Sequence, residues 1–430
     1  MRIGMPTTSY PSHAGDAAGA FVRTLAVALA RRGHTIDVIA PSVGRQDPLG
    51  DRGVHVHRVR YAPRVLERTF GRFGAPDNLA RDPFAWPGAL SFPLALARSI
   101  AEHEREWDAI VSHFVVPTSL VASRFARGRP HVAVAHGTDV HVAASIPGLA
   151  ARVLRSADAL VCVSRALAFR LDAQDAIIQP MGIDRDETRS LDRDAARART
   201  KLTRFTALSL ARLVPIKGID VAIRAVASLD DVDLLIAGDG PERAGLETLA
   251  RSLRAPVRFV GHVSSIDRIA LLAGSDAFVA PTRTMGLRTE GAPTSVVEAM
   301  AAGLPIVASF ALAALVGGAG LISDGTVDSI ACDIARLRDD STLCDRLARA
   351  GRRASRAHDA SEVAKRFESL LRFDDHGVRG ERRRERRLRD APRVLELGQH
   401  DAVRRAAPVD DHHALERAVR IQVEPDTIDL

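Results

Sequence analysis

The stretch EGAPTSVVEAMAAGLPIVAS, residues 290–309, decides the architecture of the second half of the chain. A helix is expected to begin near Ser295, because Ser295 and Glu298 have the S-x-x-E spacing of a capping box. The Gly and Pro of the GLP sequence end this helix, and LPIVAS is typical of a buried strand. The stretch therefore predicts a polar loop, a helix and a buried strand in succession.

Two carboxylates lie in this stretch. Glu290 stands in the loop before the helix, and Glu298 stands in its first turn. The unpaired backbone N–H groups at the start of a helix favour an anion such as a phosphate. A plainer interpretation remains open at this point: Glu298 caps the helix, and Glu290 is a solvated loop charge.

The length and composition indicate a globular protein of two domains. A chain of 430 residues exceeds the usual size of one hydrophobic core. No run of about 20 apolar residues could span a bilayer, and the start MRIGMPTTSY predicts a strand rather than a signal peptide. Cys162, Cys332 and Cys344 lack metal-ligand spacing, which indicates reduced thiols in a cytoplasmic protein.

The net charge of +7 raises the question of a nucleic-acid or membrane partner. Arginines are spread along the chain, however, and their densest run, residues 382–389, lies in a tail. The tail, residues 374–430, has no convincing alternation of helices and strands. We expect it to be disordered with solvated charges, so no nucleic-acid partner is predicted.

Short apolar strands alternate with helical segments in the first half of the chain. The expected strands cover residues 2–6, 35–40, 55–60, 109–113, 132–135 and 159–164. This alternation implies a parallel sheet with helices on both faces. An irregular stretch with several Pro and Gly, residues 61–93, interrupts it.

The alternation restarts after a polar run rich in Arg and Asp, residues 186–204, which is the expected linker. The strands expected before the opening stretch cover residues 205–210, 234–237, 257–260 and 277–280. The sequence thus predicts an α/β protein with two tandem Rossmann-like domains, residues 1–185 and 205–356. One more helix is expected within residues 357–373.

Charged residues gather where the predicted strands of the second domain end, which is where doubly wound α/β domains bind ligands. ARLVPIKG, after the strand at residues 205–210, places Arg212 and Lys217 in one loop. Arg and Lys suit a diphosphate, and the two carboxylates of the opening stretch suit sugar or ribose hydroxyls. A sugar nucleotide carries all of these groups.

The first domain contributes candidates at two positions. AHGTDVH places His136 and Asp139 at the carboxyl end of a strand. Gly15 and Gly19 lie between the first strand and its helix, with Asp16 beside Gly15, and glycines there would let the backbone approach a ligand closely.

Seven motifs together resemble the retaining glycosyltransferases of family 4, which have the GT-B fold: GDAAGAFV, ALARRGH, AHGTDVH, ARLVPIKG, GDGPE, FVGHV and EGAPTSVVEAMAAGLPIVAS. The resemblance covers residues 1–373. It implies that the two Rossmann-like domains face each other across a cleft and that the second binds most of the nucleotide-sugar donor. FALAALVGGAGLI departs from the family, which has a glycine pair, a Pro and a Glu there, so contacts from this loop are not assigned.

The resemblance also implies a role for each candidate residue. Glu290 and His136 would act beside the donor sugar, Arg212 and Lys217 would hold the diphosphate, and Glu298 would bind the ribose. The other donor-binding candidates are Gly19 at the phosphate, Val260, Gly261 and His262 at the base, and Ala292, Pro293, Thr294 and Ser295 around the phosphate and sugar. Asp16 and Asp139 would lie on the acceptor side.

The resemblance implies the activity of a retaining hexosyltransferase and the front-face mechanism usually proposed for the family. Positive charge from Arg212, Lys217 and the helix start near Ser295 would stabilise the leaving diphosphate, so no metal or other cofactor is expected. Front-face attack aided by the leaving phosphate would require no carboxylate nucleophile, unlike retaining glycosidases. The alternatives are another GT-B sugar-nucleotide enzyme, such as an epimerase, and a non-catalytic protein that binds sugar nucleotides without turnover.

The acceptor, whether a glycan, a lipid-linked or a small molecule, is not assigned. Residues 61–93 would help to select it, because basic and apolar side chains alternate there: Arg64, Arg68 and Arg72 beside Val65, Leu66, Phe70 and Phe73. One hypothesis is a peripheral contact with the anionic inner face of the cell membrane. The alternative is a solvated face with an ordinary core side.

Overall fold

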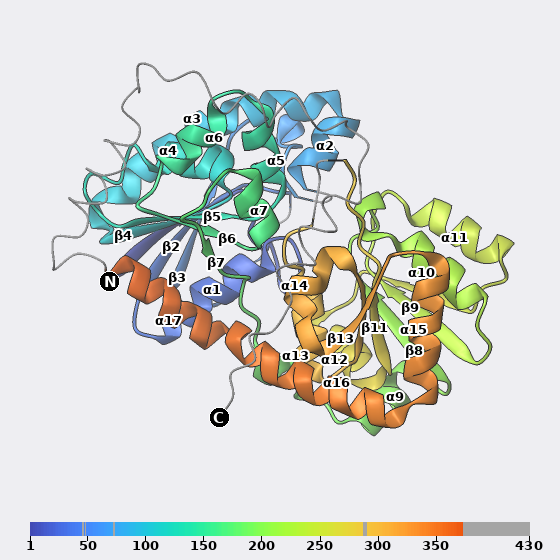
Figure 1. Cartoon of the computed structure of the whole chain (residues 1–430). Helices are drawn as coiled ribbons and strands as arrows, with labels where there is room; N and C mark the ends of the chain where they lie inside the picture. The colour runs from blue at the N-terminus through green and yellow to red at the C-terminus, as the bar shows by residue number, and fades with distance from the viewer. Residues whose placement is uncertain (45–46, 48, 72–73, 287–289, 373–430) are drawn as a thin grey trace, which may run out of the picture. The chain divides into compact units, whose positions relative to one another are not determined.

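The computed structural model describes residues 1–372 except 45–46, 48, 72–73 and 287–289. Within these residues the chain forms two parallel sheets, one from each half, with helices packed against them (Figure 1). The two sheets confirm the predicted pair of Rossmann-like domains. The predicted tail, residues 374–430, lies outside the described residues.

The first sheet has the strand order β3-β2-β1-β4-β5-β6-β7 among the described residues, and all its pairs are parallel. Its strands are β1 (Arg2–Pro6), β2 (Thr35–Pro41), β3 (Val54–Val59), β4 (Ala109–His113), β5 (His131–Ala135), β6 (Ala159–Cys162) and β7 (Ile177–Ile178). Every residue of β4 and β5 is buried, as expected for strands covered on both faces. β7 is not predicted from the sequence, because two residues carry no periodicity.

The second sheet has the order β10-β9-β8-β11-β12-β13 in the described part of the chain, again with parallel pairs. Its strands are β8 (Phe205–Leu210), β9 (Val232–Ala237), β10 (Val257–Gly261), β11 (Ala277–Ala280), β12 (Ile306–Ser309) and β13 (Gly320–Ser323). β12 is fully buried, which confirms the strand predicted from LPIVAS. β13 is not predicted, because it is a short edge strand that begins with glycine.

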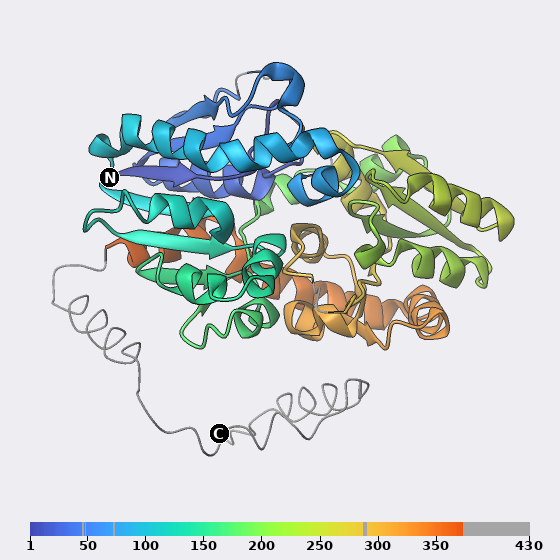
Figure 2. The same ribbon diagram turned by 90° about the horizontal axis from the view of Figure 1, so that it is seen from above.

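Helices flank both sheets, as the view from above also shows (Figure 2). Those of the first half are α1 (Ala20–Arg31), α2 (Ala75–Arg81), α3 (Trp86–His103), α4 (Leu120–Ala122), α5 (Thr138–Ser145), α6 (Leu149–Leu154) and α7 (Arg165–Arg170). Those that follow are α8 (Arg185–Thr188), α9 (Arg193–Thr200), α10 (Ile219–Ala227), α11 (Arg243–Ser252), α12 (Ser265–Gly274), α13 (Thr294–Ala302), α14 (Ala313–Val316), α15 (Val327–Asp339), α16 (Ser341–Ala354) and α17 (Ala360–Leu371).

Two stretches expected to be irregular contain helices. Residues 61–93 include α2 and the start of α3. Pro87 does not prevent α3, because it stands in the first turn, where its missing N–H is tolerated. The expected linker contains α9, whose Ala196 is fully buried. Arg197 of α9 donates to the carbonyl oxygen of Gly274 at 3.1 Å, so this part of the linker packs onto the second half.

The last helix returns to the first half. Phe367 and Leu371 of α17 belong to the same hydrophobic core as Leu25 of α1, and Arg32 pairs with Glu368. Figure 1 shows α16 beside the second sheet and α17 continuing to the first.

The chain therefore passes between the halves twice, and the two passages lie side by side. Ile183 donates a backbone hydrogen bond to His358 and accepts one from Ala360, both at 2.9 Å. A single pair of adjacent segments thus joins the two halves along the backbone.

Candidate active site

The helix of the opening stretch, α13, begins at Thr294, with Pro293 at its N-cap position and no side-chain cap. The predicted capping box is therefore wrong. The helix starts one residue earlier than expected, and Glu298 lies in its second turn with a buried side chain. Because no side chain caps α13, its first backbone N–H groups can bind an anion near Thr294 and Ser295.

Glu298 is held by an arginine. Arg268 of α12 pairs with Glu298 and with Glu187 of α8, the second at 3.2 Å. Burial raises the pKa of the Glu298 carboxyl, and the neighbouring Arg268 charge opposes that shift. Arg268 contacts Glu298 through Oε1 of the carboxylate.

Lys217 and Glu290 come together although 73 positions separate them in the sequence numbering. Lys217 Nζ lies 2.8 Å from Glu290 Oε2, and the two side chains are 14% and 20% exposed. Glu290 is therefore not a solvated loop charge. Backbone contacts fix the lysine loop: Arg283 donates to the carbonyl oxygen of Ile216 at 2.8 Å, and a Cβ on Gly218 would lie 2.0 Å from the Pro281 carbonyl oxygen.

Arg212 reaches across to the first half of the chain. Its Nη1 lies 2.9 Å from the carboxylate of Asp77 on α2. Both predicted diphosphate ligands, Arg212 and Lys217, thus contact carboxylates in this structure. A bound diphosphate would compete with Asp77 and Glu290 for these two cations.

His136 lies in a cluster of rings at the end of β5. Its Nε2 lies 3.0 Å from Nδ1 of His113, and the rings of Phe21 and Phe114 pack against it at 4.8 and 4.6 Å. Burial lowers the pKa of His136 well below the ordinary value of 6.5, and the neighbouring His113 lowers it further. His136 is therefore a neutral imidazole at neutral pH.

The segment around Gly291, just before α13, touches this cluster. A Cβ on Gly291 would lie 2.9 Å from the carbonyl oxygen of His136 and 2.8 Å from Cγ2 of Val163. Only glycine allows the loop to lie this close to the first half. Ala292, the next residue, packs against the first-half core.

The two aspartates predicted on the acceptor side have structural partners. Buried Asp139 accepts backbone hydrogen bonds from Val115 at 2.7 Å and from Gly137 at 2.8 Å, so it fixes the loop that carries His136. Burial raises the pKa of Asp139, and these backbone donors oppose the shift. Asp16 accepts from Ser12 and from the Ala18 backbone at 2.9 Å, which closes the turn before α1.

The loop that contains Gly15 and Gly19 contacts His262, which follows β10. His262 Nε2 donates to the carbonyl oxygen of Gly15 at 3.0 Å. Gly261 has φ +71° at the end of β10, where the register with β9 shifts, and Val260 packs against the core beneath it. A Cβ on Gly19 would lie 2.4 Å from the Ser9 carbonyl oxygen, so the chain's own turn already requires glycine there.

Several residues of this arrangement are not identified from the sequence. Arg268, Asp77, His113 and Gly291 act through partners that are distant in the chain, and no local motif marks them. A clue existed only for Gly291, which lies inside the quoted EGAPTS stretch.

The apolar side chains of residues 61–93 do not share one surface, as the alternative of a solvated face with an ordinary core side implies. Phe70 is buried in a core with Phe92, whereas Val65 is exposed. Arg72 and Phe73 lie outside the described residues. The exposed apolar residues gather instead on α3, where Trp86, Leu90 and Leu94 are 53%, 76% and 77% exposed.

These three side chains are spaced four residues apart, so they form one stripe along the helix. Phe84 is exposed just before α3, and the guanidinium of Arg68 lies 5.9 Å from its ring centre. We call Phe84, Trp86, Leu90 and Leu94 the α3 stripe. It is an apolar surface beside basic groups.

No described helix is both long and apolar enough to cross a membrane. No three His, Cys, Asp or Glu side chains of the described chain gather as a metal site would require.

Two family models match the chain: "Glycosyltransferase Family 4" over residues 18–187 and "Glycosyl transferases group 1" over residues 192–354. Each covers one of the two sheets almost completely. The chain belongs to glycosyltransferase family 4. It is therefore a glycosyltransferase, with an α/β fold of the GT-B type.

Curated relatives cover most of the chain. A GDP-mannose-dependent alpha-(1-6)-phosphatidylinositol monomannoside mannosyltransferase of Mycobacterium tuberculosis is 29% identical over 388 residues, 82% of this chain and 92% of the relative. A putative teichuronic acid biosynthesis glycosyltransferase of Bacillus subtilis is 27% identical, over 71% of this chain and 80% of that relative.

Solved structures support the fold. Sucrose-phosphate synthase of Thermosynechococcus elongatus aligns with a TM-score of 0.69 at 19% identity, over 86% of this chain and 98% of that one. HepE of Anabaena, in complex with UDP and glucose, aligns with a TM-score of 0.67 at 20% identity, over 86% of this chain and 99% of that one.

Proposed function

We propose that this glycosyltransferase moves a mannosyl group from GDP-mannose to a lipid-linked acceptor, with retention of configuration and without a metal ion. Two observations support the donor: the mannosyltransferase relatives are named as GDP-mannose-dependent, and Lys217 and Glu290 meet beside the start of α13. The ion pair carries the proposal, because it joins a phosphate ligand to a sugar ligand.

The leaving group is GDP, on which negative charge develops as the sugar–phosphate bond breaks. Lys217 would exchange its contact with Glu290 for a diphosphate oxygen, and Arg212 would do the same with Asp77. The backbone N–H groups of Thr294 and Ser295 would add their dipoles. These fixed positive groups supply the stabilisation that a metal ion supplies in other transferases.

The sugar would be held by neutral and anionic groups. Glu290, once separated from Lys217, would accept hydrogen bonds from mannosyl hydroxyls. His136 is neutral, so it can hydrogen-bond to the sugar without placing a second positive charge near the developing oxocarbenium. Glu298 would bind the ribose through Oε2, with Arg268 holding its other oxygen.

The α3 stripe supports a lipid-linked acceptor. Exposed Trp86, Leu90 and Leu94 would enter the interface of a bilayer, and Arg68 and Arg98 would face anionic headgroups. The phosphatidylinositol-based acceptors in the names of the mycobacterial relatives are consistent with this surface. We propose a peripheral membrane contact on this basis.

Donor turnover tests the proposal directly. The protein is incubated with GDP-mannose or UDP-glucose, with and without vesicles that contain phosphatidylinositol monomannoside, in buffer with EDTA. We expect GDP release and a mannosylated lipid only with GDP-mannose and vesicles, and an α-linkage by NMR. Turnover of UDP-glucose alone would overturn the donor assignment, and isomerisation of GDP-mannose without an acceptor would favour the epimerase alternative.

A further inference from the structure

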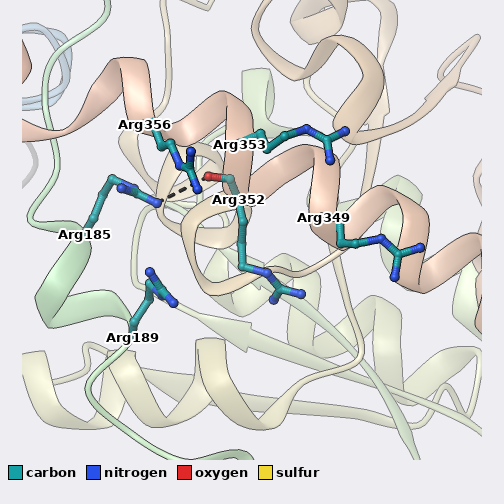
Figure 3. Close-up of a pocket in the computed structure, with 6 residues that line it drawn as sticks. All are labelled: Arg185, Arg189, Arg349, Arg352, Arg353 and Arg356. Carbon is teal, nitrogen blue, oxygen red and sulfur yellow. Dashed lines mark hydrogen bonds between the residues drawn. The ribbon is translucent and has the colours of Figure 1, made fainter.

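Six arginines line one cavity of about 240 Å³ on the side of the second half where the chain passes between the halves (Figure 3). They come from two segments that are far apart in sequence. Arg185 and Arg189 belong to α8 and the residue after it, and four follow along α16 and the turn after it: Arg349, Arg352, Arg353 and Arg356. No acidic residue lines this cavity, which we call the arginine pocket.

None of the six forms an ion pair with a carboxylate within the described part of the chain. Other arginines of the second half do, among them Arg193, Arg197, Arg204 and Arg268. Two acidic residues of α8, Asp186 and Glu187, lie between Arg185 and Arg189 in the sequence. Neither lines the pocket, and Glu187 is engaged by Arg268. The cluster thus concentrates positive charge without a described counter-charge. Like charges placed this close repel one another unless an anion joins them.

Two of the six guanidinium groups, those of Arg185 and Arg352, donate to neutral oxygens. Arg185 Nη2 donates to the carbonyl oxygen of Arg352 at 3.3 Å (Figure 3). Its Nε donates to Ser355 Oγ at 3.3 Å. Arg352 Nη1 donates to the carbonyl oxygen of Ala302 at 3.4 Å. Neutral oxygens thus orient two guanidinium groups and leave their charges unneutralised.

We propose that the arginine pocket binds an anion with more than one phosphoryl charge. Guanidinium groups recognise phosphate oxygens through paired N–H donors, and six of them can neutralise a diphosphate or a bisphosphate. The cavity is smaller than the ~300–1,000 Å³ of a pocket for a whole drug-sized ligand, so it suits phosphoryl groups alone. The chemistry is shared by soluble polyphosphates and by phosphorylated lipid headgroups.

A second cavity, of about 310 Å³, shares Arg189 and Arg352 with the pocket. Leu191, Leu272 and Leu304 are among its lining residues. The remainder of such a ligand, an uncharged body attached to the phosphoryl groups, would lie there.

The pocket is separate from the proposed donor site. The proposed donor loop around Gly291 precedes the N-terminal end of α13. Arg352 contacts Ala302 and Gly303, at the C-terminal end of the same helix. A Cβ on Gly303 would lie 1.7 Å from Arg352 Nη1, so a larger residue there would displace this guanidinium. Two anions, one at each end of α13, can therefore bind at the same time.

Calorimetric titration with pyrophosphate at physiological ionic strength tests the site. All proteins carry Lys217→Ala, which weakens pyrophosphate binding at the donor site. We expect binding that Arg353→Gln/Arg356→Gln weakens by at least about tenfold. Arg346→Gln, an exposed arginine of α16 that does not line the pocket, is the control and should bind like the parent.

Three outcomes would overturn the proposal: no binding by the parent, equal binding by the double variant, or an equal loss in the Arg346→Gln control. Arg353 and Arg356 are both exposed, so the double variant should keep its fold. Melting temperatures of the parent and the variant check this. Arg349→Gln gives a second, independent variant. Flotation with vesicles of phosphatidylinositol phosphates separates the sources, since loss of flotation in the double variant identifies a lipid headgroup. The outcome does not depend on which sugar nucleotide is the donor.

Discussion

The ammonium group of Lys217 lies 2.8 Å from the carboxylate of Glu290, and both side chains are largely shielded from solvent. The two residues are predicted to serve different parts of one substrate, the diphosphate and the sugar. In the structure they form an ion pair with each other. With the roles proposed above, donor binding would separate a shielded ion pair and replace each half with a substrate group.

Lys217→Ala should weaken GDP binding. A charge-assisted hydrogen bond contributes about 1.5–3 kcal/mol, so we expect a loss of roughly tenfold to a hundredfold in affinity. Isothermal titration with GDP measures it. Lys365→Ala is the matched control, because Lys365 pairs with Glu362 on the exposed face of α17. Equal affinity in Lys217→Ala and wild type would exclude the phosphate role.

Glu290→Gln should separate nucleotide binding from turnover. The substitution releases Lys217 from its ion pair, so GDP should bind as tightly as to wild type, or more tightly. The rate of mannosyl transfer should fall by about a hundredfold, because the sugar loses a charged acceptor. Titration with GDP and a turnover assay distinguish the two effects. A weaker affinity for GDP with an unchanged rate would contradict the assignment.

Arg268→Ala should destabilise the fold. It leaves the buried carboxylate of Glu298 without a partner, and breaking a buried pair costs about 3–5 kcal/mol. Chemical denaturation measures the change. Adding Glu298→Gln should restore part of the stability, whereas Arg251→Ala on the exposed face of α11 should have little effect. If the double variant is no more stable than Arg268→Ala, the unpaired carboxylate of Glu298 is not the cause of the lost stability.

Buried histidines should make the protein sensitive to acid. Burial lowers the pKa of His113 to about 3 and that of His131 to about 4, from an ordinary value of 6.5. Below pH 6.5 the unfolded chain binds protons that the folded chain does not, so stability is present above 6.5 and is lost as the pH falls toward 4 and 3.

Each such histidine should lower the free energy of unfolding by about 1 kcal/mol per pH unit in that window. Urea denaturation at several pH values between 6.5 and 4 measures the slope. His113→Asn should make it shallower, and the exposed His55→Asn serves as the control. An unchanged slope in His113→Asn would show that another group dominates.

Leu90→Gln/Leu94→Gln should reduce binding to vesicles that contain anionic lipid. Both side chains are exposed, so the substitutions should leave the melting temperature unchanged. Flotation measures the bound fraction, and Leu253→Gln, at the exposed end of α11, is the control. No flotation of the wild-type protein would exclude the membrane contact.

The sequence predicted where the ligand-binding loops lie better than it predicted which side chains meet there. Strand ends follow from apolar runs, so the loops of Arg212 and Lys217 could be placed at one sheet edge. The partners of these residues depend on tertiary packing. Arg268 joins α8, α12 and α13, and no local pattern encodes that junction.

Two predictions failed because a local motif has more than one outcome. The S-x-x-E spacing predicts a capping box, but α13 begins at Thr294, and Glu298 turns inward to Arg268. Pro87 and Pro93 suggested an irregular stretch, whereas α3 accommodates one in its first turn and the other in its interior. The exposed α3 stripe could be recognised only once that helix was established.

The return of α17 also bears on how the protein is made. Val363, Phe367 and Leu371 complete the hydrophobic core of the first half, yet they leave the ribosome after the entire second half. Domains generally fold in the order of synthesis. Here the first domain stays without α17, and its α17-binding surface stays uncovered, until the second domain has been translated. A nascent chain stalled before residue 360 would therefore expose a site for chaperones on an otherwise folded domain.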